Sequence, residues 1–356
     1  MPYCRKCGSK LDDEAKFCHM CGTPVTPILT VTQREAAAPP VRRSPFPFVA
    51  VILIAILVIA VVGLAIALVP LQPVSFNQSN EASAPNVDSL RLVVEAEVDN
   101  VNVMLKDLPG NQRATINVSA TGRRGIFGTD RPLALAFKEN TGDSTLTYSV
   151  NVSRAEGWPV YNPLDVECDV YLDPSVNLDI TIRTETGSIT MNAFNKDVTL
   201  QKLNLETITG SVQASLEKGV VIAGDISLQT TTGSAQLVWD EVEISRSVTV
   251  NVMTTTGSTE VDITQSRQLE GNVTLNAQTT TGGVNFAMTI RNEVGARISA
   301  GTTVGGINIQ QQGFSGNQAP VESDNYPALS NFIVNLATTL GGIDVNAVYE
   351  LGGVRS

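Results

Sequence analysis

The stretch ISLQTTTGSAQLVW, residues 226–239, contains the pattern that decides the fold of most of this chain: two alternating apolar runs joined by threonines and a glycine. The turn recurs seven times, as TETGS, TITGS, TTTGS, TTTGS, TTTGG, TTVGG and TTLGG. Its central glycines are Gly187, Gly210, Gly233, Gly257, Gly282, Gly305 and Gly341. Their separations are 23, 23, 24, 25, 23 and 36 residues, so a unit of about 23 residues repeats, with an insertion before the last turn.

Apolar residues flank each turn at alternate positions, as Leu203 and Leu205 do before Gly210 and as Val212 and Ala214 do after it. This period of two predicts strands with one buried face. A repeat too short to bury its own face must stack on its copies, so we expect a mainly β fold, a parallel β-solenoid over residues 87–350. Threonines of neighbouring rungs, about 4.8 Å apart, should form hydrogen-bonded ladders. An antiparallel sandwich in which the turns are hairpins is the alternative.

The run LDVECDVYLDPSVNLDITIRTETGSI, residues 164–189, and the TxTGSI turns resemble the toastrack-type putative adhesin domain of prokaryotic membrane proteins. The resemblance covers roughly residues 87–348. It implies a β-solenoid of largely undefined function, and it supplies no ligand-binding residues.

The chain opens with two C-x2-C pairs separated by ten residues, and a glycine follows each pair. The cysteines are Cys4, Cys7, Cys18 and Cys21. Four thiolates at this spacing fill the tetrahedral shell of a structural zinc ion and leave no position for water. The pattern predicts a zinc ribbon over residues 1–23 and resembles the short zinc ribbons that precede many prokaryotic membrane segments. Two redox-active pairs are the alternative.

Residues 48–69, FVAVILIAILVIAVVGLAIALV, carry no charge. As a helix they would extend about 33 Å, enough for a hydrocarbon core of about 30 Å. We expect one transmembrane helix at residues 46–70, between a disordered linker at 24–45 and a further linker at 71–86. The core of a signal peptide is the alternative, although such cores are shorter and cleavage would remove the zinc site.

Charge and cysteine distribution predict the orientation. Arg34, Arg42 and Arg43 precede the helix, and no Lys or Arg follows until Arg91, which places the amino terminus in the cytoplasm and the β domain outside the plasma membrane. Residues 71–356 hold 17 Lys and Arg against 31 Asp and Glu. A net charge of −14 would repel the phosphate backbone, which argues against nucleic-acid binding by this portion.

The β domain offers no recognisable catalytic or cofactor-binding set. The only histidine is His19, which removes imidazole chemistry from the β domain. Its one cysteine, Cys168, lies in an alternating strand pattern and is expected to be buried. Several carboxylates do not recur in register with a basic partner and are expected to form a solvated acidic face. They are Asp225, Asp240, Glu241, Glu260 and Asp262.

Two segments could form binding surfaces or merely cover the stack. Residues 311–327 read as a polar loop projecting from the last rungs. Trp158 and Tyr161 lie in a loop and are expected to cap an open end of the solenoid, with a sugar or protein contact as the alternative.

These features predict a non-enzymatic, single-pass membrane protein whose outer domain serves adhesion or envelope partner binding. Its partners would be the lipid bilayer and an unknown protein or surface glycan. The alternative is a transmembrane scaffold or envelope-stress sensor whose cytoplasmic zinc ribbon recruits a protein. A carbohydrate-active enzyme would require carboxylates clustered in one groove.

Overall fold

The computed structural model describes residues 3–25, 46–67, 72–124, 131–156, 164–194, 197–316 and 318–350. The chain divides into two compact units, unit 1 (Met1–Leu68) and unit 2 (Val69–Ser356). Among the described residues, unit 1 contains a small loop-rich domain and helix α1 (Phe46–Ala67), and unit 2 contains the strands of two large sheets.

The amino-terminal domain of unit 1 covers residues 3–25. One isolated β-bridge joins Tyr3 to Lys10, and a second joins Phe17 to Pro24. The small apolar core contains Cys4, Leu11, Cys18 and the partly buried Val25. A core of this size cannot stabilise a fold without a further cross-link such as a metal ion.

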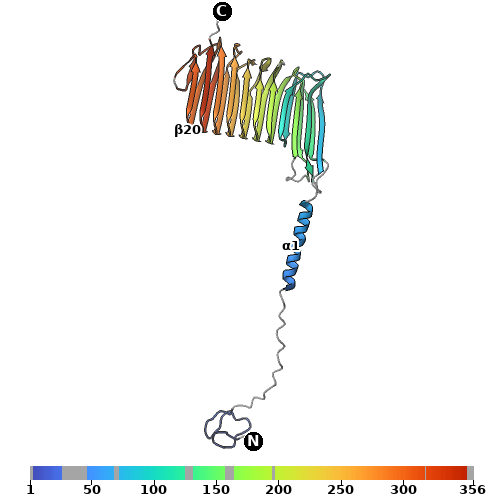
Figure 1. Ribbon diagram of the computed structural model, residues 1–356, viewed down its shortest axis with the longest axis vertical. Helices are drawn as coiled ribbons and strands as arrows, with labels where there is room; N and C mark the ends of the chain where they lie inside the picture. Colours follow the sequence, from blue (N-terminus) through green and yellow to red (C-terminus); the bar gives the residue numbers. More distant parts are fainter. Residues whose placement is uncertain are drawn as a thin grey trace, which may run out of the picture. The chain divides into compact units, whose positions relative to one another are not determined.

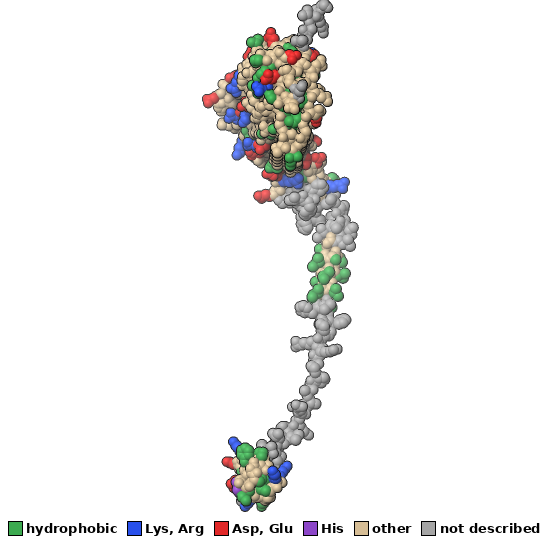
Figure 2. All heavy atoms as spheres, turned by 90° about the vertical axis from the view of Figure 1, so that its left-hand side faces the viewer, with side chains coloured by type: hydrophobic (Ala, Val, Ile, Leu, Met, Phe, Trp, Pro, Cys, Tyr) green, Lys and Arg blue, Asp and Glu red, His purple; other side chains and the backbone are tan. Residues whose placement is uncertain are grey.

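Helix α1 is apolar on every side. Of its side chains, those of residues 50–63 are described and almost all are exposed, including Val51 at 65% and Ile59 at 71%, and Figure 2 shows them as apolar. Among the residues whose side chains the structure describes, no helix is long and apolar enough to cross a membrane. The segment expected to do so, residues 48–69, extends past the described side chains, and residues 26–45 of the expected linker lie outside the described residues.

Unit 2 consists of two sheets whose strands lie side by side in a long stack (Figure 1). In spatial order, the 11-stranded sheet contains β1 (Gln72–Ser83), β4 (Gln112–Arg124), β7 (Leu164–Leu172), β3 (Asn100–Leu105), β9 (Ser188–Ala193), β11 (Val212–Leu216), β14 (Ala235–Asp240), β17 (Thr259–Gln265), β19 (Val284–Arg291), β25 (Ile343–Glu350) and β21 (Ile307–Gln312). The 14-stranded sheet contains β22 (Phe314–Ser315), β23 (Val321–Ser323), β20 (Val294–Val304), β24 (Ser330–Leu340), β18 (Val273–Thr281), β16 (Val248–Thr256), β13 (Ile226–Thr232), β10 (Val198–Thr209), β8 (Asn177–Thr186), β2 (Ser89–Ala96), β6 (Thr145–Arg154) and β5 (Leu133–Gly142), with β12 (Val220–Ile222) and β15 (Glu243–Ile244) beside this path. The prediction of a mainly β fold is confirmed.

Each glycine turn carries the chain from one sheet to the other. Strand β13 ends in the 14-stranded sheet, Gly233 follows, and β14 begins in the 11-stranded sheet. Neighbouring repeats pair in parallel and in register, with Thr230 opposite Thr254 and Ala235 opposite Thr259. Because the turns join different sheets, the alternative in which they are hairpins is wrong.

The core lies between the two sheets. The alternating positions around the turns are buried as the pattern predicts, and Leu203, Leu205 and Val212 are each 0% exposed. The largest buried side chain, Trp239, packs edge to face on Phe332 with ring centroids 5.9 Å apart. Its indole Nε1 donates a hydrogen bond to Gln265 Oε1 at 3.0 Å, so the polar atom of this buried ring is satisfied.

The repeats do not stack in chain order at the ends. Strand β24 lies between β18 and β20, and β25 lies between β19 and β21, so the last repeat in the sequence occupies the penultimate position. The long interval between Gly305 and Gly341 carries the chain back inward. A similar exchange occurs at the other end, where β3 lies between β7 and β9. Two parallel strands pair when their apolar side chains face the same side of the sheet, whether or not they are neighbours in the sequence. The observed strand order is therefore compatible with the alternating apolar pattern of the repeats.

Antiparallel strands close the amino-terminal end of the stack. Strand β1 pairs with β4, and β5 pairs with β6. The expectation of a linker over residues 71–86 is therefore wrong for the 12 residues of β1. The strand forms because Val74 and Phe76 pack against the core and Ala82 is fully buried.

A small antiparallel group covers part of the carboxyl-terminal end. The segment 311–327 was expected to be a projecting polar loop, but it contains strands β22 and β23, and β23 pairs with β20. Phe314 and Val321 are 9% and 0% exposed because they cover the end of the core. Trp158 and Tyr161 lie outside the described residues, so their capping role stays a prediction.

Candidate metal centre and the surfaces of the strand stack

The four cysteines of the amino-terminal domain come together in space. Their Sγ atoms all lie within 4.8 Å of one another. Two of the separations join the two C-x2-C pairs, 3.5 Å between Cys4 and Cys21 and 3.6 Å between Cys7 and Cys18. Zinc with Zn–S bonds of about 2.3 Å holds tetrahedral sulfurs about 3.8 Å apart. The site therefore fits one zinc ion shared by both pairs, which favours zinc over two separate redox pairs.

The two halves of the site are built by the same local geometry. Gly8 N donates to Cys4 O at 2.9 Å, and Gly22 N donates to Cys18 O at 2.8 Å. Both glycines have positive φ, 72° and 71°, a conformation that favours glycine. This turn brings the two cysteines of each pair onto one side.

Two hydroxyl groups that the sequence interpretation did not single out complete the site. Ser9 Oγ lies 3.0 Å from Cys18 Sγ and 3.1 Å from Cys7 Sγ, and Thr23 Oγ1 lies 3.2 Å from Cys21 Sγ. The hydrogen bond from Ser9 lowers the pKa of Cys18 to about 6, and that from Thr23 lowers the pKa of Cys21. The available signal was the repeated order Cys, Gly and a hydroxyl residue in both halves.

The arrangement can hold a metal ion and offers no catalytic position. Four thiolates would complete the zinc shell, and zinc would then stabilise the domain without binding substrate. His19, between the last two cysteines, is exposed and lies outside the cysteine cluster.

In unit 2, buried threonines connect each turn to the next. In six of the seven turns, the third residue before the glycine donates its hydroxyl to the glycine carbonyl of the preceding rung in the stack at 2.8–3.0 Å. These bonds run from Thr207 to Gly187, Thr230 to Gly210, Thr254 to Gly233, Thr279 to Gly257, Thr338 to Gly282 and Thr302 to Gly341. The expected threonine-to-threonine ladder is wrong apart from one bond, from Thr184 to Thr207 at 2.9 Å. The hydroxyls instead satisfy carbonyls that would otherwise lose a hydrogen bond.

The threonine next in sequence points outward and lines a groove along the turn edge. The groove has a volume of about 640 Å³, and five rungs each contribute two threonines to its lining, the hydroxyl donor and the exposed threonine that follows it. The exposed threonines are Thr231, Thr255, Thr280, Thr339 and Thr303. Glu206 is the one charged residue among the described residues that line it. The surface is therefore dominated by hydroxyl groups at a regular spacing.

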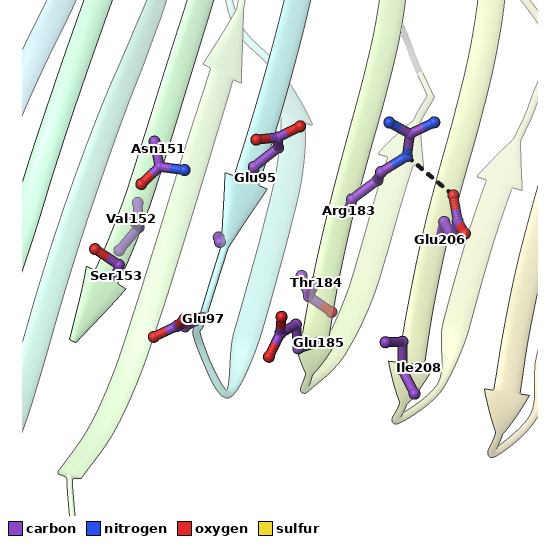
Figure 3. A pocket seen from close by; sticks show the side chains of 11 residues that line it. Glu95, Glu97, Asn151, Val152, Ser153, Arg183, Thr184, Glu185, Glu206 and Ile208 are labelled. Carbon is purple, nitrogen blue, oxygen red and sulfur yellow. Dashed lines mark hydrogen bonds and ion pairs between the residues drawn. The ribbon is translucent and has the colours of Figure 1, made fainter.

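A second hollow, of about 310 Å³, adjoins this groove and contains four glutamates from neighbouring strands and turns, as Figure 3 shows. They are Glu95, Glu97, Glu185 and Glu206. Arg183 Nε lies 3.0 Å from Glu206 Oε2, and both side chains are about half exposed. Solvent therefore screens this ion pair strongly.

The carboxylates expected to form an acidic face do not form one cluster. Asp225 accepts a hydrogen bond from the backbone of the next rung, Thr249 N, at 2.9 Å, and Glu241 accepts one from Ser266 N at 2.9 Å. Glu260 and Asp262 line a separate hollow of about 310 Å³ on the 11-stranded sheet. These carboxylates are structural acceptors or exposed groups.

Cys168 is buried as expected. It is 0% exposed, and burial raises the pKa of its thiol to about 12. Tyr148, also buried, has its pKa raised chiefly by burial, and its hydroxyl donates to Asn80 Oδ1 at 2.7 Å. Both groups belong to the core.

Solved structures to which the chain is similar have β-rich folds and adhesin names. A "putative cell adhesion protein" from Clostridium sporogenes gives a TM-score of 0.38 at 13% identity, over 77% of this chain and 99% of that chain. A "putative adhesin" from Bacteroides fragilis gives 0.28 at 11% identity, over 76% and 97% of the two chains. One from Parabacteroides distasonis gives 0.28 at 12% identity, with the same coverage. Likenesses of this size assign no ligand.

No curated protein matches the chain. Residues 3–25, however, match the zinc-ribbon domain family. With four cysteines within 4.8 Å of one another, the expectation of a ribbon with structural zinc is confirmed. The amino-terminal segment of this chain is a zinc-ribbon domain.

Proposed function

We propose that this protein is anchored in the plasma membrane by α1 and displays unit 2, a non-catalytic β-solenoid, outside the cell as a module for adhesion or envelope partner binding. The observation that carries the binding role is the hydroxyl-lined groove along the turn edge. Five rungs each place one exposed threonine in it, and the threonine before it is bonded to the neighbouring rung. A rigid surface of this kind loses little conformational entropy when it binds a partner.

The membrane anchor is supported by α1 and the sequence around it. The helix has 22 residues without a charge, which corresponds to a length of about 33 Å. Its described side chains are exposed and apolar, so burial in lipid would remove that surface from water. Arg34, Arg42 and Arg43 on its amino-terminal side support a cytoplasmic ribbon.

Labelling of intact cells with a membrane-impermeant maleimide tests this topology. A Thr231→Cys variant should be labelled without permeabilisation, whereas the wild-type chain should be labelled only after permeabilisation and removal of zinc. Cys168 gives no background because it is fully buried. Labelling of wild-type ribbon cysteines on intact, chelator-treated cells would refute the orientation.

Binding by the groove is tested with the full chain in nanodiscs and immobilised cell-envelope material. Lysine at positions 231, 255 and 280, in place of threonine, should abolish retention. The matched control carries lysine at Asn285, Ala287 and Asn346, which line the separate hollow on the other sheet. Equal retention of both variants would remove the groove as the binding surface.

The alternative, a transmembrane scaffold or envelope-stress sensor, is favoured by the surface of the ribbon. Tyr3, Phe17 and Met20 are 64%, 63% and 72% exposed, and exposed apolar groups on so small a domain suit a protein partner. Replacing Cys4 and Cys7 by serine should leave surface binding intact under the first proposal and abolish the downstream response under the second.

A further inference from the structure

One sheet edge at the carboxyl-terminal end of unit 2 lacks the features that usually prevent strand pairing. Among the described strands, the two sheets end in β1, β21, β22 and β5. Strand β1 contains Pro73 and Glu81, β5 contains Lys138 and Glu139, and β22 has two residues. Strand β21, INIQQQ, has six residues and neither a charge nor a proline. Charge, proline and short length are the common protections of an edge, so β21 is the unprotected one.

The backbone of β21 presents three residues to that open side. Ile343 N donates to Gly306 O at 2.9 Å, which directs the backbone groups of residue 306 toward β25. In a parallel pair, the N–H and C=O groups of successive residues point to opposite sides. The groups of Ile307, Ile309 and Gln311 therefore face away from β25, and no described strand pairs with them.

Apolar side chains gather at the same corner. Val304, Ile307 and Leu340 are 58%, 40% and 49% exposed, and Val304 and Leu340 pair directly across β20 and β24. In the five preceding turns, threonine occupies the position of Val304 and Leu340. The change from threonine to valine and leucine occurs only in the two outermost rungs, where it produces an apolar patch beside the open edge.

The strands at this end carry little charge, although residues 71–356 have 14 more acidic than basic side chains. Strands β20, β21, β22 and β23 contain one basic and one acidic residue, Arg297 and Glu322, and these two lie 3.6 Å apart. Figure 2 looks onto this end and shows mostly uncharged side chains, with apolar ones among them. Two copies could therefore approach here without strong repulsion.

We propose that β21 is the docking site for β21 of a second copy, antiparallel about a two-fold axis at Ile309. In this register Ile309 faces Ile309 of the second copy and Ile307 faces Gln311. Each such pair exchanges two hydrogen bonds, so all six outward-facing backbone groups of each copy are satisfied. Shifting the register by two residues would leave groups unpaired. The outer side chains then match as well, Asn308 opposite Gln310 of the other copy.

The pairing joins the 11-stranded sheets of the two copies into one sheet. The β1 strands, where each chain enters unit 2, lie at its two opposite ends. Ten strand spacings of about 4.8 Å separate β1 from β21 in each copy, so the two β1 strands lie about 100 Å apart along the joined stack. The association is a property of unit 2 and does not depend on the proposed anchor or groove.

Disulfide trapping of the full chain in detergent micelles tests the register. In a double variant, Asn308→Cys with Gln310→Cys, the new thiols of the two copies are directly opposite and within disulfide reach. Mild oxidation should give a covalent dimer on a non-reducing gel, and Asn308→Cys alone should give at least tenfold less. The matched control, Asn285→Cys with Ala287→Cys, occupies the equivalent positions on the inner strand β19 and should give no dimer.

Light scattering over a concentration series tests the association itself. The wild-type chain should form a dimer, and Ile307→Lys should weaken it by about tenfold or more, because a two-fold axis introduces the charge twice. Ile208→Lys, at an equally apolar position 54% exposed on another rung, should leave the dimer unchanged. Circular dichroism of both variants checks that they fold. If Ile307→Lys does not fold, the disulfide trapping of the cysteine variants still tests whether two β21 strands pair. A monomeric wild-type chain would overturn the proposal, even if β21 were found to bind a strand of another protein. Equal trapping by the cysteine pairs on β21 and on β19 would also overturn it.

Discussion

Replacement of Gly257 by alanine should destabilise unit 2 far more than an ordinary glycine-to-alanine change in a strand. Gly257 has a φ of +139°, and a Cβ built on it would lie 1.9 Å from Gly233 O and 2.7 Å from Gly233 C. The obstructing atoms are backbone and cannot move aside as a side chain could. Gly233 O also accepts the hydroxyl of Thr254 at 3.0 Å, so any shift at this point disturbs the contact between two rungs.

The expected magnitude follows from these contacts. The backbone conformation costs a residue with a Cβ about 1–2 kcal/mol. Separating the rungs of Gly233 and Gly257 weakens the bond from Thr254 to Gly233 O and the bond from Gly233 N to Thr256 O, 2.9 Å long, each worth about 1 kcal/mol. The free energy of unfolding should therefore fall by about 3–4 kcal/mol.

Urea unfolding of the full chain in detergent micelles, followed by far-ultraviolet circular dichroism and tryptophan fluorescence, measures this loss. Gly301→Ala is the matched control, because a Cβ there meets nothing within 4 Å and the backbone is not left-handed. That variant should stay within about 0.5 kcal/mol of the wild type. Equal midpoints for the two alanine variants would refute the account of the glycine turns.

Four further outcomes are expected. Thr254→Val should cost about 1 kcal/mol of unfolding free energy and Thr254→Ser much less, since only valine removes the donor to Gly233; equal urea midpoints for the two would contradict this. A zinc chelator should abolish the structure of residues 3–25 and leave the circular dichroism of the strands unchanged, and loss of the strand signal would count against independent units. Ser9→Ala removes the hydrogen bond that lowers the pKa of Cys18 to about 6, so protons should displace zinc at a higher pH in a colorimetric release assay, an effect absent if Ser9 is only a surface residue. Burial raises the pKa of Cys168 from 9.0 to about 12, so this thiol should resist alkylation in the folded chain at pH 8. Above pH 9 the thiol ionises in the unfolded chain only, so the free energy of unfolding should fall. Rapid labelling at pH 8 would show that the core opens.

The candidate site was largely predictable where its chemistry is local. The spacing of Cys4, Cys7, Cys18 and Cys21 implied a shared ion, because each pair and its glycine form a turn within a few residues. The hydroxyls of Ser9 and Thr23 were missed, although they occupy the same place in each half. Residue type alone does not show whether a serine near a cysteine points toward it, and the backbone turn decides that.

The amino-acid sequence by itself determined the repeat, the two faces of each strand and the positions where only glycine is compatible with the turn. These depend on residue spacing, because side chains alternate along a strand and each repeat must present one apolar face. Only the tertiary structure decided which repeat lies beside which, that β1 continues the sheet, and that β24 and β25 insert one position inward. The rungs beginning TTVGG and TTLGG are so alike that local pattern cannot order them. Their order depends on pairing between distant segments and on the short strands β22 and β23, which cover one half of the final rung and leave the edge of β21 open.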